Sequence, residues 1–238
     1  MRWTEESIAF LRDAAAMSDY YRVIAERIAP HLPQNARVCD AGCGIGSLSL
    51  ALLPYCAEIT AVDADALAIR TMQETLPERG INALCGDVSG LAPEEPYDAM
   101  VFCLFGRTED ALRIAKRQCR GRAFLVKRDY SHHRFSAGRV SLGEFTADST
   151  ANVLREKKIP YALERFSAEF GQPLRSLADA ERFFSLYNRS EGEALSAREI
   201  EARLIAGPSP EFPWYLPHRK ALCLFTLNTS DIPEEENA

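Results

Sequence analysis

Residues 37–46 read Arg-Val-Cys-Asp-Ala-Gly-Cys-Gly-Ile-Gly, and the helix-forming run Ser-Leu-Ser-Leu-Ala-Leu-Leu follows at 47–53. This stretch predicts a strand that ends at Asp40, a tight turn with three alternate glycines, and a helix. A side chain at Gly42 or Gly44 would obstruct a ligand lying against the backbone, and only glycine adopts positive φ without cost. The start of a helix offers free backbone N–H groups to an anionic or polar ligand. We therefore expect a ligand to bind at this turn.

The spacing of the glycines distinguishes two kinds of ligand. A dinucleotide-binding turn follows the pattern G-x-G-x-x-G, which would place the third glycine at position 47. Here the third glycine is Gly46, and the next residue is Ser47. Asp40, two residues before the first glycine, would repel a pyrophosphate but suits a ligand that carries a cation. The pattern therefore favours such a ligand over a dinucleotide.

Outward from this turn, short apolar runs alternate with helical stretches. The predicted strands are 37–40, 59–62, 83–85, 99–102 and 123–126, and helices are predicted near 46–56, 65–79 and 108–118. Alternation at this spacing is typical of right-handed βαβ crossovers. We therefore predict an α/β fold, a doubly wound and mostly parallel sheet with helices on both faces.

The rest of the chain predicts a leading helix and an insertion. Apolar residues recur at helical spacing over 4–29, and Pro30 ends that helix. After a histidine-bearing loop at 129–141, the pattern predicts helices near 145–157, 176–187 and 196–206, an alternating run over 161–170 and a strand at 221–227. Residues 171–219 are too long for a turn between two strands, so we interpret them as an inserted helical cap. The predicted parts are an N-terminal helical segment (1–34), a ligand-binding domain (35–170 with 220–230) and the cap (171–219).

Composition excludes several classes of protein. In 238 residues, 47% are hydrophobic and 26% charged, which is ordinary for a globular chain. The net charge of −6 disfavours nucleic acid as a partner. No apolar run approaches the ~18 to 20 residues that span a bilayer, and residues 1–10 carry charges where a signal peptide is apolar. Seven cysteines without a C-x-x-C motif predict neither disulfides nor a zinc site. We expect a soluble, cytoplasmic protein with no membrane contact.

The motifs together resemble the class I, Rossmann-like S-adenosylmethionine-dependent methyltransferases. The first motif of that family is an acidic residue, any residue, then G-x-G-x-G, which Asp40 to Gly46 match. Asp63 ends the second predicted strand, where the family has an acid that bonds both ribose hydroxyls, and Asp87 ends the third, where the family has an Asp facing the adenine amino group. Tyr97-Asp98 matches the "YD" that commonly begins the fourth strand. The match covers about residues 35–130.

The resemblance implies a seven-stranded mixed sheet whose last strand is antiparallel, with the cap between the last two strands. It also implies S-adenosylmethionine as the methyl donor and S-adenosylhomocysteine as the product. Tyr21 enters the expected site because the leading helix commonly folds across the donor. The predicted donor-binding residues are Asp40, Gly42, Cys43, Gly44, Gly46, Asp63, Ala64, Asp87, Val88, Cys103 and Tyr21.

Each of these residues also has a purely structural interpretation. Asp63 can be the N-cap of the helix that follows it, and Asp87 can cap a turn into 88–90. Tyr21 lies on the apolar face of its helix and can pack in the core, and Cys103 can be a small packing residue. The aromatic residues Phe212, Trp214 and Tyr215 can line a substrate pocket or form a core of the cap itself.

The predicted function is transfer of a methyl group to a small molecule. The family's amide and nucleobase methyltransferases carry [N/D]-P-P-[Y/F] where this chain has Phe102-Cys-Leu-Phe-Gly106. His132 and His133 follow the fifth strand, so either is a candidate base for an acceptor, or both are surface residues. Asp129 is the one carboxylate placed for metal-dependent catechol methylation, so no metal is expected. A protein or RNA acceptor, or donor binding without transfer, remain alternatives. The methylated atom (O, N, S or C), the acceptor and the oligomeric state stay open.

Overall fold

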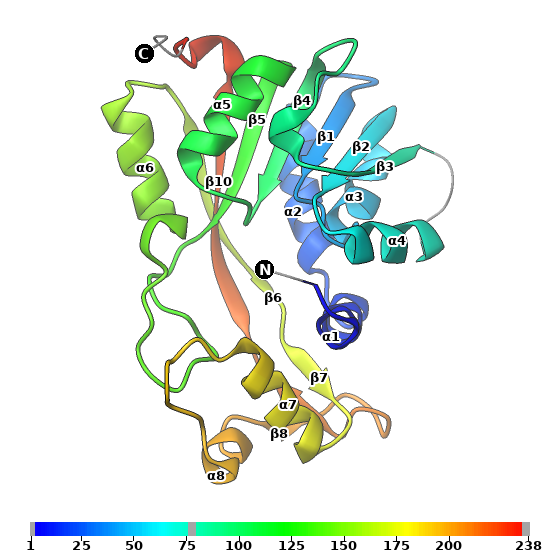
Figure 1. Ribbon diagram of the computed structural model, residues 1–238, viewed down its shortest axis with the longest axis vertical. Coiled ribbons are helices and arrows are strands. Elements are labelled where there is room, and N and C mark those ends of the chain that lie inside the picture. Colours follow the sequence, from blue (N-terminus) through cyan, green and yellow to red (C-terminus); the bar gives the residue numbers. More distant parts are fainter. Residues whose placement is uncertain (1–2, 76–79, 235–238) are drawn as a thin grey trace.

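The computed structural model describes residues 3–75 and 80–234, and its centre is one mixed sheet (Figure 1). The strands, in spatial order, are β3 (Ile81–Cys85), β2 (Glu58–Asp63), β1 (Arg37–Ala41), β4 (Tyr97–Cys103), β5 (Cys119–Arg128), β10 (Arg219–Asn228) and β6 (Ala162–Glu169). The pairs among β1 to β5 are parallel, and β10 runs antiparallel to both β5 and β6. The predicted seven-stranded sheet with an antiparallel last strand is confirmed.

Helices cover both faces of this sheet. One face is buried under α2 (Tyr20–Ile28), α3 (Ser47–Leu52) and α4 (Ala66–Thr75), and the other under α5 (Thr108–Gln118) and α6 (Ala147–Glu156). The strand interiors are almost fully buried because both faces are covered, which explains their continuous apolar runs. Among residues 3–75 and 80–234, no helix is long and apolar enough to cross a bilayer.

The leading segment contains two helices, so the prediction of one helix over 4–29 is wrong. The first, α1 (Glu5–Ala16), begins with a capping box between Thr4 and Ser7. The helix is interrupted at 17–19 before α2 starts, because Ser18 and Asp19 favour caps and turns over a helix interior. The break lets α1 pack against residues 171–219 while α2 packs on α3.

Residues 171–219 lie between β6 and β10, and we call them the insert. They contain α7 (Leu177–Tyr187) and α8 (Ala197–Glu201), together with β7 (Gln172–Leu174), β8 (Ile205–Ala206) and β9 (Trp214–Leu216). The three strands form a small antiparallel sheet in the order β7-β9-β8. This sheet was not predicted, and the helix expected over 196–206 ends at Glu201. Strands of two or three residues are too short to show a period in the sequence.

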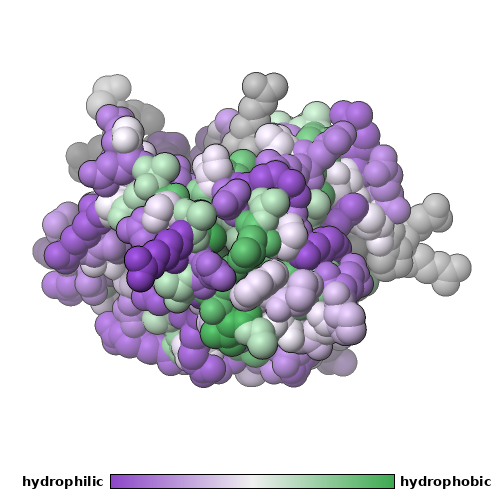
Figure 2. Space-filling view, turned by 90° about the horizontal axis from the view of Figure 1, so that it is seen from below, coloured by the Kyte–Doolittle hydropathy of each residue, from purple (hydrophilic) through white to green (hydrophobic). Residues whose placement is uncertain are grey.

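The insert has its own core and lies at the lower end of the molecule (Figure 1). Its buried apolar residues are Leu174, Ala180, Phe183, Phe184, Ile200 and Leu216, joined by Phe10 of α1. Seen from below, the surface is mostly hydrophilic with a strip of apolar residues across its middle (Figure 2). The insert is therefore a separately packed lobe with a largely polar exterior.

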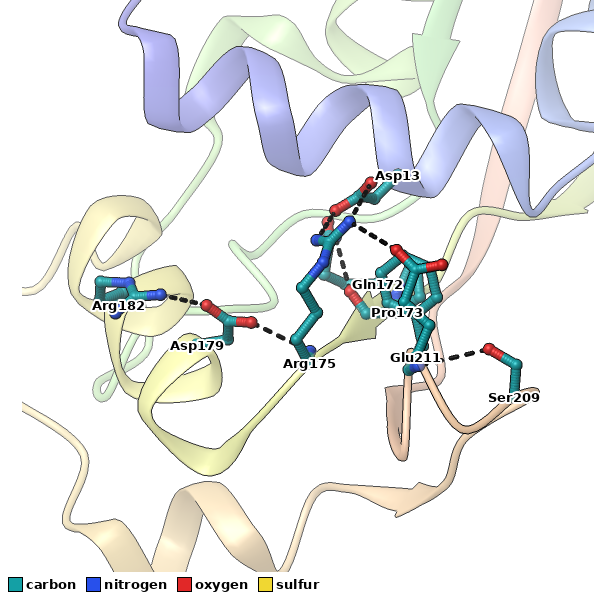
Figure 3. A network of polar contacts seen from close by, with 9 residues as sticks. Asp13, Gln172, Pro173, Arg175, Asp179, Arg182, Ser209 and Glu211 are labelled. Carbon is teal, nitrogen blue, oxygen red and sulfur yellow. Dashed lines mark hydrogen bonds and ion pairs between the residues drawn. The ribbon is translucent and has the colours of Figure 1, made fainter.

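An ion-pair network joins α1 to the insert (Figure 3). The guanidinium of Arg175, which follows β7, pairs with Asp13 of α1 and, at 3.2 Å, with Glu211. It also lies 4.4 Å from the ring centre of Phe212. The rings of Phe10 and Phe183 meet edge to face at 5.3 Å. The position of α1 therefore depends on the insert as much as on the main sheet.

A bulge between β4 and β5 yields a test of the fold. The pairing shifts between Tyr97–Cys119 and Ala99–Arg122, and Gly121 lies in that shift against the backbone carbonyl oxygen of Asp98. Gly121→Ala should lower the free energy of unfolding by about 2 kcal/mol, because a backbone neighbour cannot move aside cheaply. The matched control is Gly90→Ala, where an added Cβ meets nothing within 4 Å. Urea unfolding that finds both substitutions equally mild would contradict this account of the bulge.

Candidate functional site

The predicted strand-turn-helix unit is present at 37–52. Gly42, Gly44 and Gly46 have φ values of 73°, 56° and 81°, all in the left-handed region that favours glycine. The amides of Gly42 and Cys43 donate to the carbonyl of Val62, at 2.8 and 3.0 Å. The turn after β1 is thus anchored to the end of β2.

Two aromatic side chains lie directly on this turn. An added Cβ at Gly42 would collide with the ring of Phe105, and one at Gly44 would lie 2.6 Å from the ring of Trp3. The backbone amide of Trp3 donates to Asp65 Oδ2 at 3.0 Å, which holds the start of α1 against the turn. The glycines therefore permit a close approach by planar groups.

Asp40 is a buried carboxylate below the turn. It is 1% exposed, and Ser49 Oγ of α3 donates to its Oδ2 at 2.6 Å. Burial raises the pKa of Asp40 to about 6; the Ser49 bond opposes this shift and the charge of Asp63 adds to it. A buried group of this kind prefers a nearby cation, as the sequence suggested.

Asp63 ends β2 and holds two turns together. Its Oδ2 accepts from the Gly44 amide and its Oδ1 from the Asp65 amide, both at 2.9 Å. Asp65, not Asp63, caps α4, since Asp65 Oδ1 accepts from the Leu67 amide at 2.9 Å. The alternative that Asp63 is the helix cap is therefore wrong. Ala64 lies between the two acids and is exposed.

Asp87 follows β3 and caps a turn, as its structural interpretation predicted. It accepts from the amide of Ser89 at 2.9 Å and from the Ser89 hydroxyl at 2.7 Å, and these bonds hold its pKa below the ordinary value. The carboxylate is exposed, so it can still accept from a ligand. Val88 is buried, and its carbonyl accepts from Gln118 Nε2 at 2.7 Å.

Tyr21 and Cys103 lie over the same face of the sheet as Asp40. Tyr21 packs against Tyr20 and Phe170, with ring centres 5.0 and 5.6 Å apart, which agrees with its core interpretation. Burial raises the pKa of Tyr21, and the nearby Asp40 carboxylate adds to the shift. Burial raises the pKa of Cys103 to about 12, so it remains a neutral thiol.

The two adjacent histidines have different surroundings. His132 is engaged at both ring nitrogens, because Nδ1 lies 2.8 Å from Ser131 Oγ and Nε2 accepts from Arg139 at 2.8 Å. His133 Nδ1 lies 2.9 Å from Ser136 Oγ, and in the described part of the chain no hydrogen bond involves its Nε2. Burial, with Arg189 and Arg128 adding to it, lowers the pKa of His133 to about 4. His133 is thus neutral at pH 7.

The aromatic residues near the end of the insert pack within it. Phe212 is buried under Arg175, and Trp214 packs on the insert's core. The Tyr215 hydroxyl donates to Glu169 Oε1 at 2.7 Å. Of the two interpretations that the sequence left open, the contacts of Phe212 and Trp214 favour a core of the insert itself, whereas Tyr215 bonds to the end of β6 outside the insert.

Lys127 is a residue of the site that was not predicted from the sequence. Lys127 is 1% exposed, and its Nζ donates to the carbonyls of Phe105 and Gly106 at 3.1 and 3.0 Å, which holds the loop after β4. Burial, with Arg128 adding to it, lowers the pKa of Lys127 to about 8. The sequence did contain a signal for this role, namely a lysine at the end of an otherwise apolar strand. Such a position is buried in a doubly wound sheet, so a charged residue there needs a specific partner.

Comparisons with known proteins agree with this geometry. Residues 38–123 match the model of a family described as a methyltransferase domain. The chain is similar in structure to a putative type II methyltransferase from Anaeromyxobacter dehalogenans, at 16% identity and a TM-score of 0.56 over 90% of this chain and 97% of that one. It is also similar to a putative methyltransferase from Bacillus halodurans, at 13% identity and a TM-score of 0.55 over 87% and 98%. YcgJ from Bacillus subtilis gives 16% identity and a TM-score of 0.54 over 87% and 98%.

No curated protein matches the chain. The sheet order and the glycine turn define the class I methyltransferase fold. Residues 38–123 thus match a methyltransferase-domain family whose members generally use S-adenosylmethionine, and the fold is that of the class I, Rossmann-like methyltransferases.

The buried carboxylate gives a pH-dependent prediction. The native pKa of Asp40 is about 6 and its unfolded value is near 4, so its contribution to stability is present below pH 4 and lost as the pH rises through 6. Asp40→Asn keeps an acceptor for Ser49 without the charge. Its free energy of unfolding should therefore exceed that of the wild type by about 2 kcal/mol at pH 7 and by little at pH 4.

Urea unfolding at both pH values measures this difference. The control is Asp98→Asn, because bonds from Arg37 and Arg120 outweigh burial and hold the pKa of Asp98 below its ordinary value. Its effect should have the opposite sign at pH 7. An Asp40→Asn difference that stays constant from pH 4 to 7 would disprove the assignment of a charged, buried Asp40.

Proposed function

We propose that the chain binds S-adenosylmethionine at the glycine turn and transfers its methyl group directly to a small-molecule acceptor. The observation that carries the proposal is the placement of Asp40, Asp63 and Asp87 at the ends of β1, β2 and β3. These strands are parallel neighbours in register, so their ends meet at one sheet edge. In open α/β sheets, ligands bind outside the carboxyl ends of the strands.

The donor would lie along this edge with its methionine end at 42–46. Asp40 supplies a negative charge near the cationic end of the donor. Each Asp63 oxygen accepts one backbone amide and keeps a lone pair, so the carboxylate can accept from two ribose hydroxyls without releasing the turn. Asp87 and Val88 would flank the adenine. The rings of Trp3 and Phe105 would have to move from the glycines or stack on the donor.

When bound, the donor supplies a methyl group that is already electrophilic, so the chain needs no nucleophilic residue. The chain's task is to hold the acceptor in line at ~3 to 3.5 Å and to exclude water. We place the acceptor between the sheet edge, the 129–141 loop and the insert. Phe135 of the loop packs edge to face on Phe183 of the insert at 5.0 Å, so the loop and the insert form one wall. A concave, enclosed pocket suits a metabolite better than a polymer, and this wall would form one side of such a pocket.

His133 is the better placed of the two candidate bases. It is neutral and its Nε2 is free of described partners, whereas His132 is bonded at both nitrogens. A protein or RNA acceptor, and a module that binds the donor without transfer, remain the competing functions. Methyl-labelled donor incubated with a metabolite extract distinguishes them, since only the proposed function labels a small product.

Donor binding is tested at Asp63. Asp63→Ala should weaken the binding of S-adenosylhomocysteine by about 1.5 to 3 kcal/mol, as expected for charge-assisted bonds to hydroxyls. The control is Glu58→Ala at the opposite end of the same strand, which should leave the affinity unchanged. Isothermal titration calorimetry measures both. Equal affinities for wild type and Asp63→Ala would refute the donor site.

The role of His133 as the base is tested by comparing it with the adjacent His132. His133→Gln should lower the rate of methyl transfer by about 10² or more, with donor affinity within about twofold of wild type. His132→Gln should change neither quantity. Rates are followed as release of S-adenosylhomocysteine with the labelled acceptor. A His133→Gln enzyme of normal rate would mean that no base is needed there.

A further inference from the structure

Basic side chains from separate parts of the chain converge beside the proposed methyl position. We call Arg128, His133, Arg134, His218 and Lys220 the basic cluster. Arg128 of β5 pairs with Leu222 of β10, two residues from Lys220, and the His218 ring, just before β10, lies 4.9 Å from Phe135 in the loop that carries His133 and Arg134. In agreement with this placement, burial lowers the pKa of His218 to about 3, and the charges of Lys220, Arg134 and Arg128 add to the shift.

The strand register places the cluster next to the donor edge. Cys103, at the end of β4, pairs with Val126, and Arg128 lies two residues further along β5. Arg128 pairs with Leu222, and Lys220 lies two residues before it. Since side chains alternate along a strand, Arg128 and Lys220 share the face that carries Cys103 and Asp40.

The arginines and the lysine of the cluster lack an ion-pair partner in the described part of the chain. Among residues 3–75 and 80–234, no salt bridge involves Arg128, Arg134 or Lys220. The nearby acids have other hydrogen-bond donors. Glu169 accepts from the Tyr215 hydroxyl and from the backbone amide of His218, at 2.7 and 3.0 Å. Asp40, on the same face of the sheet, accepts from Ser49 Oγ at 2.6 Å. Asp129 pairs with Arg165 at 3.4 Å. Partly buried positive charge without a counter-ion is costly, so it calls for an anionic ligand.

The imidazole of His218 gives independent evidence for a ligand, because its ring nitrogens lack hydrogen-bond partners among the described residues. It is 3% exposed, and neither of its ring nitrogens has a hydrogen-bond partner among the described residues. Its ring packs against Phe135 at 4.9 Å and Tyr130 at 6.4 Å. A neutral imidazole has one donor and one acceptor, and leaving both unsatisfied in the interior costs free energy. A ligand oxygen would satisfy the donor.

Aromatic rings hold the ammonium group of the cluster in place. Lys220 Nζ lies 4.2 Å from the ring centre of Phe170 and 4.8 Å from that of Tyr20. Such contacts are attractive but do not neutralise the charge. The ammonium is therefore held beside an apolar wall and remains available to an anion.

We infer that the methyl acceptor is a small molecule carrying an oxyanion, a carboxylate or a phosphate, held by Arg128, Lys220 and His218. This inference rests on the proposed function, because it identifies the cluster with the acceptor side of that site. The buried position of His218 argues against the phosphates of a polymer, which could reach only an open surface.

Binding of two simple anions tests the inference. Benzoate and inorganic phosphate are titrated at constant ionic strength against chloride, with and without S-adenosylhomocysteine, and the ring nitrogens of His218 are followed by NMR. One anion should bind saturably and shift these nitrogens, and the tighter of the two identifies a carboxylate or a phosphate acceptor. Arg128→Gln and Lys220→Gln should each weaken that binding about tenfold. The matched control, Arg117→Gln on the exposed side of α5, should not.

The outcomes separate this inference from the proposed function. S-adenosylhomocysteine should bind wild type and all three variants within about twofold. If it binds but neither anion shifts His218, the inference is wrong and the donor site stands. If S-adenosylhomocysteine does not bind the wild type, the proposed function fails whatever the anions do. Tighter binding of a short oligouridylate than of phosphate, lost in Arg128→Gln, would replace the inference with an RNA acceptor.

Discussion

The carboxylate of Asp63 accepts from the amides of Gly44 and Asp65, and this pair of bonds connects the turns that follow β1 and β2. The first turn shapes the surface at 42–46, and the second carries Asp65, which caps α4 and receives the Trp3 amide. The start of α1 is therefore positioned through Asp63 as well. A single acid at a strand end thus organises the glycine turn, a helix start and the N-terminal segment.

The N-terminal helix couples this turn to the insert. At one end Trp3 lies on Gly44, and further along Asp13 and Phe10 contact Arg175 and Phe183. The insert contacts the 129–141 loop through Phe135, which also touches His218. A continuous chain of contacts therefore runs from the glycine turn through α1 and the insert to the 129–141 loop. A ligand that moves Trp3 from the turn would act on the insert and on this loop.

The buried titratable groups around the site have pKa values shifted away from their ordinary values. Burial raises the pKa of Asp40 to about 6 and lowers those of Lys127 and Lys220 to about 8 and about 7. Each shift means that the charged form destabilises the unliganded fold. Groups of this kind cluster at functional sites, where a ligand of opposite charge offsets the cost. Asp40 lies below the turn that suits a cation, and Lys220 lies where an anion is proposed, whereas Lys127 bonds to the loop after β4.

The local sequence determined the parallel sheet, the glycine turn and the three acidic strand ends, because apolar runs, glycine conformation and strand-helix alternation are properties of neighbouring residues. It did not determine the break in the leading helix or the small sheet of the insert, since these follow from packing between distant segments. Only the tertiary structure brought Arg128, His218 and Lys220 together, because strands five and ten become neighbours through antiparallel pairing across some ninety residues of chain. It also decided that Asp65 caps α4 and that His133 differs from His132, because both depend on partners that no local pattern specifies.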